Sequence, residues 1–330
     1  EKSLDIDYGF DMQILRNRLS LSVGGFYKHT YDILGDRLAS LPSTFGGTMP
    51  KENYATIDTK GFEIELSYKD KIGDDFSYNI SGNLGYAVNE LITKDEAENI
   101  RPYKSELGYN TDRQMGYVAT DIIRTQTELD ALPEGYTIFG KKPELGMLNY
   151  KDIRGANSDE PDGKIDSNDQ EWVIKHTKSP INYGFSVGGS WKGLSVDLFF
   201  QGVAGGKRFY DKRIEWGGME ETSYAFRADY WTPENTDAKY PAAGWENGAG
   251  EASTFWIQDT SFLRLKNVSI TYQLTQPLVS RWGLSQMRFF LIGTNLFLLQ
   301  DKIKDYDPEN SSIMNYPLMK TYSFGVNVSF

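Results

Sequence analysis

The chain ends in Thr321-Tyr322-Ser323-Phe324-Gly325-Val326-Asn327-Val328-Ser329-Phe330. In this stretch, aromatic or aliphatic residues occupy every second position, and small or polar residues lie between them. Because successive side chains of a β-strand point to opposite faces of a sheet, a period of two predicts a strand with one apolar and one polar face.

The same period recurs upstream. It predicts further strands at 4–14, 19–27, 62–68, 76–88, 183–191, 196–200, a segment ending at 274, and 287–299. Paired as hairpins, these strands leave short connections at one end and four long ones, at about 35–55, 90–180, 204–254 and 301–318, at the other. Transmembrane β-barrels have short periplasmic turns and long extracellular loops. We therefore place the long loops outside the cell, although a soluble sandwich or propeller with insertions would give a similar pattern.

The composition fits an all-β chain. Aromatic residues make up 14% of the sequence and there are 32 glycines, but no apolar run approaches the roughly 18 residues of a membrane-spanning helix. Any membrane span must therefore use strands. The absence of cysteine excludes disulfide and thiol chemistry, and the net charge of -11 argues against a nucleic-acid partner. The first residues carry no signal peptide, so we expect a processed chain or an internal fragment.

Charged residues test the membrane hypothesis. A Lys or Arg facing lipid at the bilayer midplane costs about 2–4 kcal/mol, and the apolar face of the predicted strands is free of both at mid-strand. Arg264 and Lys266 are exceptions, because counting in steps of two from Val268 places both on the apolar face. We expect both to lie at the outer end of their strand, above the hydrocarbon.

A succession of short motifs carries a family likeness. The motifs are Lys60-Gly61-Phe62-Glu63-Ile64-Glu65-Leu66, Pro161-Asp162-Gly163-Lys164-Ile165-Asp166, Pro180-Ile181-Asn182-Tyr183-Gly184-Phe185, Trp191-Lys192-Gly193-Leu194, Phe199-Phe200-Gln201-Gly202-Val203, Phe262-Leu263-Arg264-Leu265-Lys266-Asn267-Val268, and Thr294-Asn295-Leu296-Phe297. In this order and spacing they resemble the SusC/RagA family of TonB-dependent outer-membrane transporters. The matches span nearly the whole chain.

The resemblance implies a 22-stranded barrel with an N-terminal plug, of which this chain is the C-terminal part with about nine strands. The plug and the remaining strands are expected elsewhere in the protein, since nine strands would leave two open edges in lipid. By the resemblance, the protein is not an enzyme and imports a nutrient, most simply an oligosaccharide, with a SusD-like surface lipoprotein and TonB. Alternatives are a peptide, siderophore or vitamin as ligand, or a secreted β-protein that binds or hydrolyses polysaccharide.

An acidic stretch in the second long loop suggests a cation site. Its oxygen-bearing side chains are Asp152, Asn157, Asp159, Asp162, Asp166 and Asp169. The second half, with Asp162 followed by Gly163, matches a Ca²⁺ loop, whereas the first half has extra residues. Bound Ca²⁺ or Mg²⁺ is one interpretation, and a solvated acidic loop is the other. No other cofactor is expected.

Aromatic residues in the long loops are candidates for ligand contact. They are Trp216, Trp231, Trp245 and Trp256. Indole rings stack on sugar faces, but they also pack loops against each other. We predict no catalytic residue. By the resemblance, the apolar positions Tyr322, Phe324, Val326, Val328 and the terminal Phe330 form the signal that the barrel-assembly machinery recognises.

Overall fold

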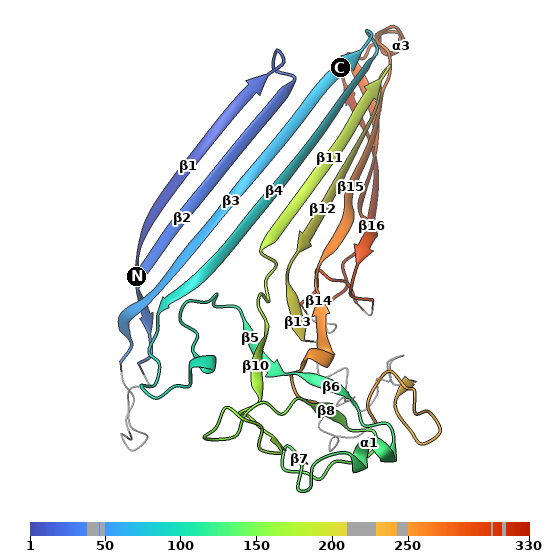
Figure 1. Ribbon diagram of the computed structural model, residues 1–330. Helices are drawn as coiled ribbons and strands as arrows, with labels where there is room; N and C mark the ends of the chain where they lie inside the picture. Colours follow the sequence, from blue (N-terminus) through green and yellow to red (C-terminus); the bar gives the residue numbers. More distant parts are fainter. Residues whose placement is uncertain (38–45, 47–49, 210–228, 243–249, 305, 312–314) are drawn as a thin grey trace. The chain divides into compact units, whose positions relative to one another are not determined.

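The computed structural model describes residues 1–37, 46, 50–209, 229–242, 250–304, 306–311 and 315–330. It divides into two compact units (Figure 1). The sheet unit consists of Glu1–Thr111, Lys178–Gly206 and Thr260–Phe330, and the loop unit consists of Asp112–Thr177 and Lys207–Asp259.

The described part of the sheet unit is built on one antiparallel sheet of nine strands. In spatial order they are β1 (Lys2–Ile14), β2 (Leu19–Gly35), β3 (Glu52–Ile72), β4 (Phe76–Thr93), β11 (Ile181–Trp191), β12 (Leu194–Ala204), β15 (Phe262–Gln273), β16 (Gln286–Asp301) and β17 (Thr321–Ser329). The order along the sheet is the order along the chain, so the sheet is an up-and-down meander. The prediction of nine antiparallel strands is confirmed.

Short turns join the strands at one end of the sheet. Trp191 pairs with Leu194 across the two-residue turn at Lys192 and Gly193, and both turn residues have positive φ, of 46° and 87°. This is the type I′ conformation, whose twist matches that of paired strands. The other three short connections are 15–18, 73–75 and 274–285, and the last contains the helix α3 (Gln276–Ser280). The long connections leave from the opposite end of the strands.

The register aligns apolar residues on one face across the sheet. One row of cross-strand partners contains Met12, Leu21, Leu66, Gly82, Phe185, Phe200, Leu265 and Phe297. The adjacent row on the opposite face contains Asp11, Ser22, Glu65, Asn83, Gly184, Gln201 and Arg264. We call these the apolar face and the polar face. Many side chains of the apolar face are exposed, including Phe10 at 57% and Phe324 at 71%.

An irregularity in β15 corrects the expected position of Arg264. Val268 pairs with Leu198 and Leu265 pairs with Phe200, so β15 has one more residue than β12 over this interval. The extra residue is a β-bulge, which reverses the face of every residue beyond it. Arg264 lies near the long-connection end, as expected, but on the polar face rather than the apolar one, and only 3% of it is exposed.

The loop unit has its own small core. Its described strands are β5 (Gln114–Tyr117), β6 (Ala119–Ile122), β7 (Thr137–Ile138), β8 (Leu148–Tyr150), β9 (Lys164–Ile165), β10 (Gln170–Ile174), β13 (Lys207–Phe209) and β14 (Ile257–Asp259), with a helix α1 (Gln126–Asp130). Ile138, Leu148, Tyr150 and Ile165 are almost completely buried against each other. The segments expected to be long loops therefore contain a packed structure that the periodicity did not indicate. Within the described ranges, no helix is long and apolar enough to span a membrane.

Candidate functional site

A shallow depression of about 430 Å³ lies on the polar face of β2, β3, β4 and β11. Its polar lining consists of Ser22, Glu63, Glu65, Asn83 and Asn182. Gly24 and Gly85 also line it, and a Cβ at either position would have no neighbour closer than 3.9 Å. The absent side chains leave room over the sheet, where carboxylates, amides and a hydroxyl present both donors and acceptors. Such a surface can bind a polar solute, and the charges of the two glutamates disfavour a strongly anionic one.

Asp169 organises the predicted cation loop from within the loop unit. Its side chain is completely buried, yet both oxygens are satisfied. The backbone N–H groups of Ile153 and Arg154 donate to Oδ1 at 2.8 and 3.0 Å, and that of Asp166 donates to Oδ2 at 2.8 Å. A buried carboxylate with three charge-assisted hydrogen bonds is stable without a cation. Asp169 therefore fastens two parts of this loop together.

Three further predicted ligands act in the same way. Asp152 accepts hydrogen bonds from the backbone N–H of Asp162 at 3.3 Å and of Gly163 at 2.7 Å. Asp162 accepts from the N–H of Lys164 at 3.0 Å, and Asp166 accepts from the N–H of Asn168 at 2.7 Å. Such bonds hold turns, with Gly163 at a φ of 80° that favours glycine.

The central cation of this loop is a guanidinium. Arg154 is nine-tenths buried and donates to the carbonyls of Asn168 at 3.0 Å and Gln170 at 3.2 Å, and it forms an ion pair with Glu171. The remaining predicted ligands, Asn157 and Asp159, are exposed. Among the described residues, no group of three or more His, Asp or Glu is placed to hold a metal ion. The structure thus gives the acidic residues a role in folding the loop.

Two buried tyrosines of the loop unit have raised pKa values. Burial raises the pKa of Tyr136 to about 12, and the negative charges of Asp152 and Asp169 add to the effect. The Tyr136 hydroxyl donates to Asn149 Oδ1 at 3.0 Å. Burial likewise raises the pKa of Tyr117 to about 12. Both side chains therefore remain neutral hydrogen-bonding groups well above neutral pH.

The predicted aromatic contacts are only partly described. Trp216 and Trp245 lie outside the described residues. Trp231 is buried in the core of the loop unit, and Trp256 is buried and stacked on Tyr240, with ring centroids 6.0 Å apart. Both indoles therefore pack the loop unit internally, which was the alternative to sugar contact, and neither presents a free face to a ligand.

The expected assembly signal lies on the apolar face of the last strand. Tyr322 pairs with Gly293, Phe324 with Leu291, Val326 with Phe289 and Val328 with Met287. Phe330 follows β17, with 93% of its surface exposed, and its carbonyl accepts a hydrogen bond from the Ser285 hydroxyl at 3.3 Å. The terminal ring is thus presented at the short-turn end of the sheet.

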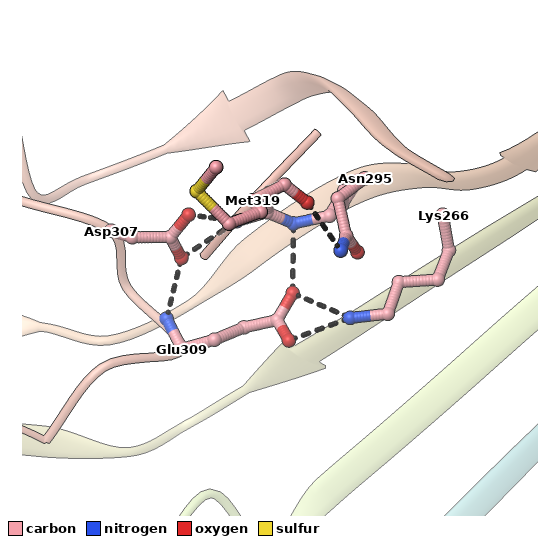
Figure 2. Close-up of polar contacts among 6 residues, drawn as sticks. Lys266, Asn295, Asp307, Glu309 and Met319 are labelled. Carbon is pink, nitrogen blue, oxygen red and sulfur yellow. Dashed lines mark hydrogen bonds and ion pairs between the residues drawn. The ribbon is translucent and has the colours of Figure 1, made fainter. Parts of the chain in front are cut away.

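The periodicity did not indicate a buried charge cluster at the other end of β15. Arg264 Nη2 donates to both carboxylate oxygens of Asp307, at 2.6 and 2.5 Å, and its Nε lies 2.7 Å from Glu309. Figure 2 shows Asp307 and Glu309 beside Lys266, Asn295 and Met319. The signal in the sequence was Asn295, an asparagine amid apolar strand residues, which tolerates the left-handed backbone found at bulges.

Comparisons with known proteins identify the sheet. The whole chain aligns with TonB-dependent receptor P3 of Formosa agariphila at 24% identity, covering 34% of that protein, and with TonB-dependent receptor SusC of Bacteroides thetaiotaomicron at 24% identity, covering 32%. The solved structure of the RagAB peptide transporter matches 99% of the chain, with a TM-score of 0.75 and 23% identity. Over its whole length, this chain is thus similar to TonB-dependent receptors of the SusC and RagA type. No family model matches it.

The SusC/RagA match explains the open sheet. The chain spans about a third of the length of the curated relatives it matches, and 35% of the matched RagAB chain. Its nine strands are thus a portion of a transporter barrel, as the fold prediction stated. The outer edges of β1 and β17, which have no partner in the described part of this chain, are where a complete barrel of this family would continue.

Proposed function

We propose that this chain forms part of the wall of an outer-membrane importer that takes up a nutrient with energy from TonB. The observation that carries the proposal is the division of the nine-stranded sheet into one continuous apolar face and one polar face. In water, an exposed apolar surface of this extent would drive association. Against lipid it is the expected exterior of a barrel, with the polar face lining the lumen.

The proposed partners follow from the family. SusC-type and RagA-type proteins support pairing with a SusD-like surface lipoprotein, and TonB would act through the plug in the part of the protein outside this chain. The long connections would then face outward, where the lipoprotein delivers substrate. The same family supports a role in transport and not in catalysis.

An oligosaccharide is the substrate we propose first. The depression on the polar face offers amides, a hydroxyl and carboxylates, which can hydrogen-bond sugar hydroxyls. A peptide is the second candidate, favoured by the likeness to a structure named for peptide transport. Uptake of labelled neutral oligosaccharides and labelled peptides by cells that carry the complete protein separates the two.

The membrane assignment is tested by fractionation of cells that make the complete protein. We expect the protein in the outer membrane, soluble only with detergent, and running faster on a gel before boiling than after, because a closed barrel resists unfolding by the gel detergent. A protein that remains soluble without detergent would overturn the proposal. It would favour instead a secreted β-protein that binds or hydrolyses polysaccharide.

A bound Ca²⁺ or Mg²⁺ in the acidic loop remains a separate proposal. The density of carboxylates supports it, whereas the use of Asp152 and Asp169 by backbone N–H groups favours a loop that folds without metal. Calorimetric titration of the chelator-treated protein with Ca²⁺ tests it. Absence of heat, together with unchanged protease sensitivity of the loop, would exclude a cation there.

A further inference from the structure

The bulge between β15 and β16 creates an unusual site at the long-connection end of the sheet. Asn267 pairs with Thr294 and Leu265 pairs with Phe297, so Lys266 stands opposite two residues, Asn295 and Leu296. Asn295 has a φ of 54°, in the left-handed region. On the other side of β15, Lys266 is the extra residue relative to β12, and this second irregularity turns Arg264 to the polar face, in the same row as Gln201.

The segment after β16 is bound to this bulge through charges. Asp307 contacts Arg264 with both carboxylate oxygens, and Glu309 contacts Arg264 at 2.7 Å and Lys266 Nζ at 2.7 Å. The N–H of Glu309 donates to Asp307 Oδ1 at 3.0 Å, which fixes the two acids relative to each other (Figure 2). The Arg264 side chain is 3% exposed, so its two ion pairs are screened by water and salt less than the partly exposed pair of Lys266 and Glu309.

Two further contacts hold the segment on either side of the acids. Ile303, shortly after the end of β16, is 1% exposed. Asn295 Nδ2 donates to the carbonyl of Met319 at 3.0 Å, just before β17 begins. The connection between β16 and β17 is therefore fastened near its start, near its middle and at its end, and two of the three fastenings use bulge residues.

We propose that residues 302–304 and 306–311 form a strap that is clamped by Arg264 over the polar face at the long-connection end of β15. Because Arg264 belongs to the polar face, the acids that reach it draw the strap to that side of the sheet. In the importer proposed above, on which this inference rests, the strap would narrow the mouth of the lumen. Its clamp lies within this chain, so the strap stays closed without the lipoprotein or a substrate.

The test is amide hydrogen exchange of the complete transporter in detergent, without lipoprotein or substrate, followed by mass spectrometry of peptides that cover 302–311. Wild-type protein should protect these peptides. Arg264→Met removes the charge and puts an apolar side chain in its place. It deprives Asp307 of its cation and leaves Glu309 paired with Lys266, so we expect exchange in the strap to rise by at least about tenfold. The peptides of β11 and β12 should be unchanged.

Two lysine variants serve as matched controls. Lys266→Met removes the more exposed cation on Glu309, and we expect a rise in exchange of about two- to threefold. Lys304→Met removes a cation in the strap itself, whose side chain is 75% exposed and pairs with Asp301, and we expect no change. If all three variants gave equal effects, loss of positive charge alone would explain them, and the clamp would be rejected.

Asn295→Gly tests the second fastening. Glycine keeps the left-handed backbone but cannot donate to Met319, so exchange should rise in peptides covering 315–320 and not in those covering 302–311. If Arg264→Met does not assemble, Glu309→Gln, which retains the Arg264–Asp307 pair, replaces it, with an expected rise of about threefold.

The outcomes separate the strap from the proposed function. Heat-modifiable migration of each variant reports the barrel independently of the strap. An Arg264→Met barrel that migrates normally with unchanged exchange at 302–311 would overturn the strap, and so would a wild-type strap that is protected only when lipoprotein or substrate is added. A wild-type protein that shows no barrel behaviour at all would instead overturn the importer.

Discussion

The two units of the chain place the same kinds of side chain in opposite positions. In the sheet unit, Leu4 and Phe10 are more than half exposed, as are Phe297 and Phe324. In the loop unit, Ile138, Leu148 and Ile165 are almost completely buried, and the described core cluster lies wholly within this unit. The sheet unit turns apolar residues outward and the loop unit turns them inward. This difference is the one expected if the sheet unit contacts lipid, as proposed above, while the loop unit packs around a core of its own.

Charged residues make the same contrast. The acids of the polar face, such as Glu63 and Glu65, are exposed, and in the proposed importer they would be solvated by the water of the lumen. In the loop unit, Asp169 is buried and takes three backbone hydrogen bonds, because a water-soluble core must satisfy every polar group that it encloses. Removing an acid should therefore destabilise the loop unit where the acid is buried, and should have little effect on the polar face of the sheet unit, where the acids are exposed.

The largest effect should follow from removing the buried carboxylate of the loop unit. Asp169→Ala leaves three N–H groups without an acceptor, and at roughly 1–3 kcal/mol for each group the loss of local stability should be about 3–9 kcal/mol. We expect hydrogen exchange across 152–171 to increase strongly while the barrel still migrates as a folded band on an unboiled gel.

Glu160→Ala is the matched control for this change. It removes one negative charge from the same loop, but the Glu160 side chain is exposed, so the expected effect is within about 0.5 kcal/mol. If both variants behaved alike, the acidic loop would depend on its total charge, as expected of a cation site, and not on the hydrogen bonds of Asp169.

A charge on the apolar face should produce the second largest effect. Val187 lies on that face, paired with Ile80 and Leu198, and Val187→Arg would place a cation against lipid at a cost of about 2–4 kcal/mol. Ser186→Arg places the same side chain one residue away on the polar face, where little loss is expected. The measurement is the amount of heat-modifiable protein in the outer membrane.

Comparing the assembly of Val187→Arg with that of Ser186→Arg tests the two faces of the sheet better than either variant alone. Equal loss for both would indicate that the sheet is covered on both faces by protein, and no loss for either would indicate that neither face contacts lipid. The importer requires that Val187→Arg assemble less well than Ser186→Arg.

A smaller effect should appear in the loop unit at alkaline pH. The pKa values of Tyr117 and Tyr136 are raised to about 12, against about 10 in an unfolded chain. A folded pKa above the unfolded one means that stability is fully present below pH 10 and is lost as pH rises from about 10 to 12, by up to about 1.4 kcal/mol per pH unit for each tyrosine. Tyrosinate absorbance and hydrogen exchange of the loop unit measure this, and Tyr136→Phe should remove about half of the loss.

The sequence predicted the sheet unit well because a sheet with one apolar and one polar face has a strict period of two. Phe185 and Val187 alternate with Ser186 and Gly188, and these four residues lie within β11, as the alternation predicts. β3 was predicted from 62 but begins at Glu52, because the charged residues before Phe62 hide the alternation.

Two features escaped the periodicity for different physical reasons. The core of the loop unit joins Ile122, Ile138, Leu148 and Ile165, which follow no common spacing and meet only through tertiary contacts. The face of Arg264 depends on the bulge at Lys266, and one extra residue reverses every side chain beyond it. Parity counted along a strand is therefore reliable only between bulges.

Deleting Phe330, at the end of the last strand, should have the smallest effect on stability. Its effect on assembly should be larger. Phe330 is 93% exposed and its ring contributes little to packing, so its deletion should leave the melting behaviour of assembled barrels unchanged. If this residue is the signal that the assembly machinery reads, the amount of protein at the cell surface should fall while uptake per assembled molecule stays constant. Phe330→Tyr, which keeps an aromatic ring at the terminus, should restore most of the surface level. Normal surface levels without Phe330 would show that the apolar face of β17, from Tyr322 to Val328, is recognised without its terminal ring.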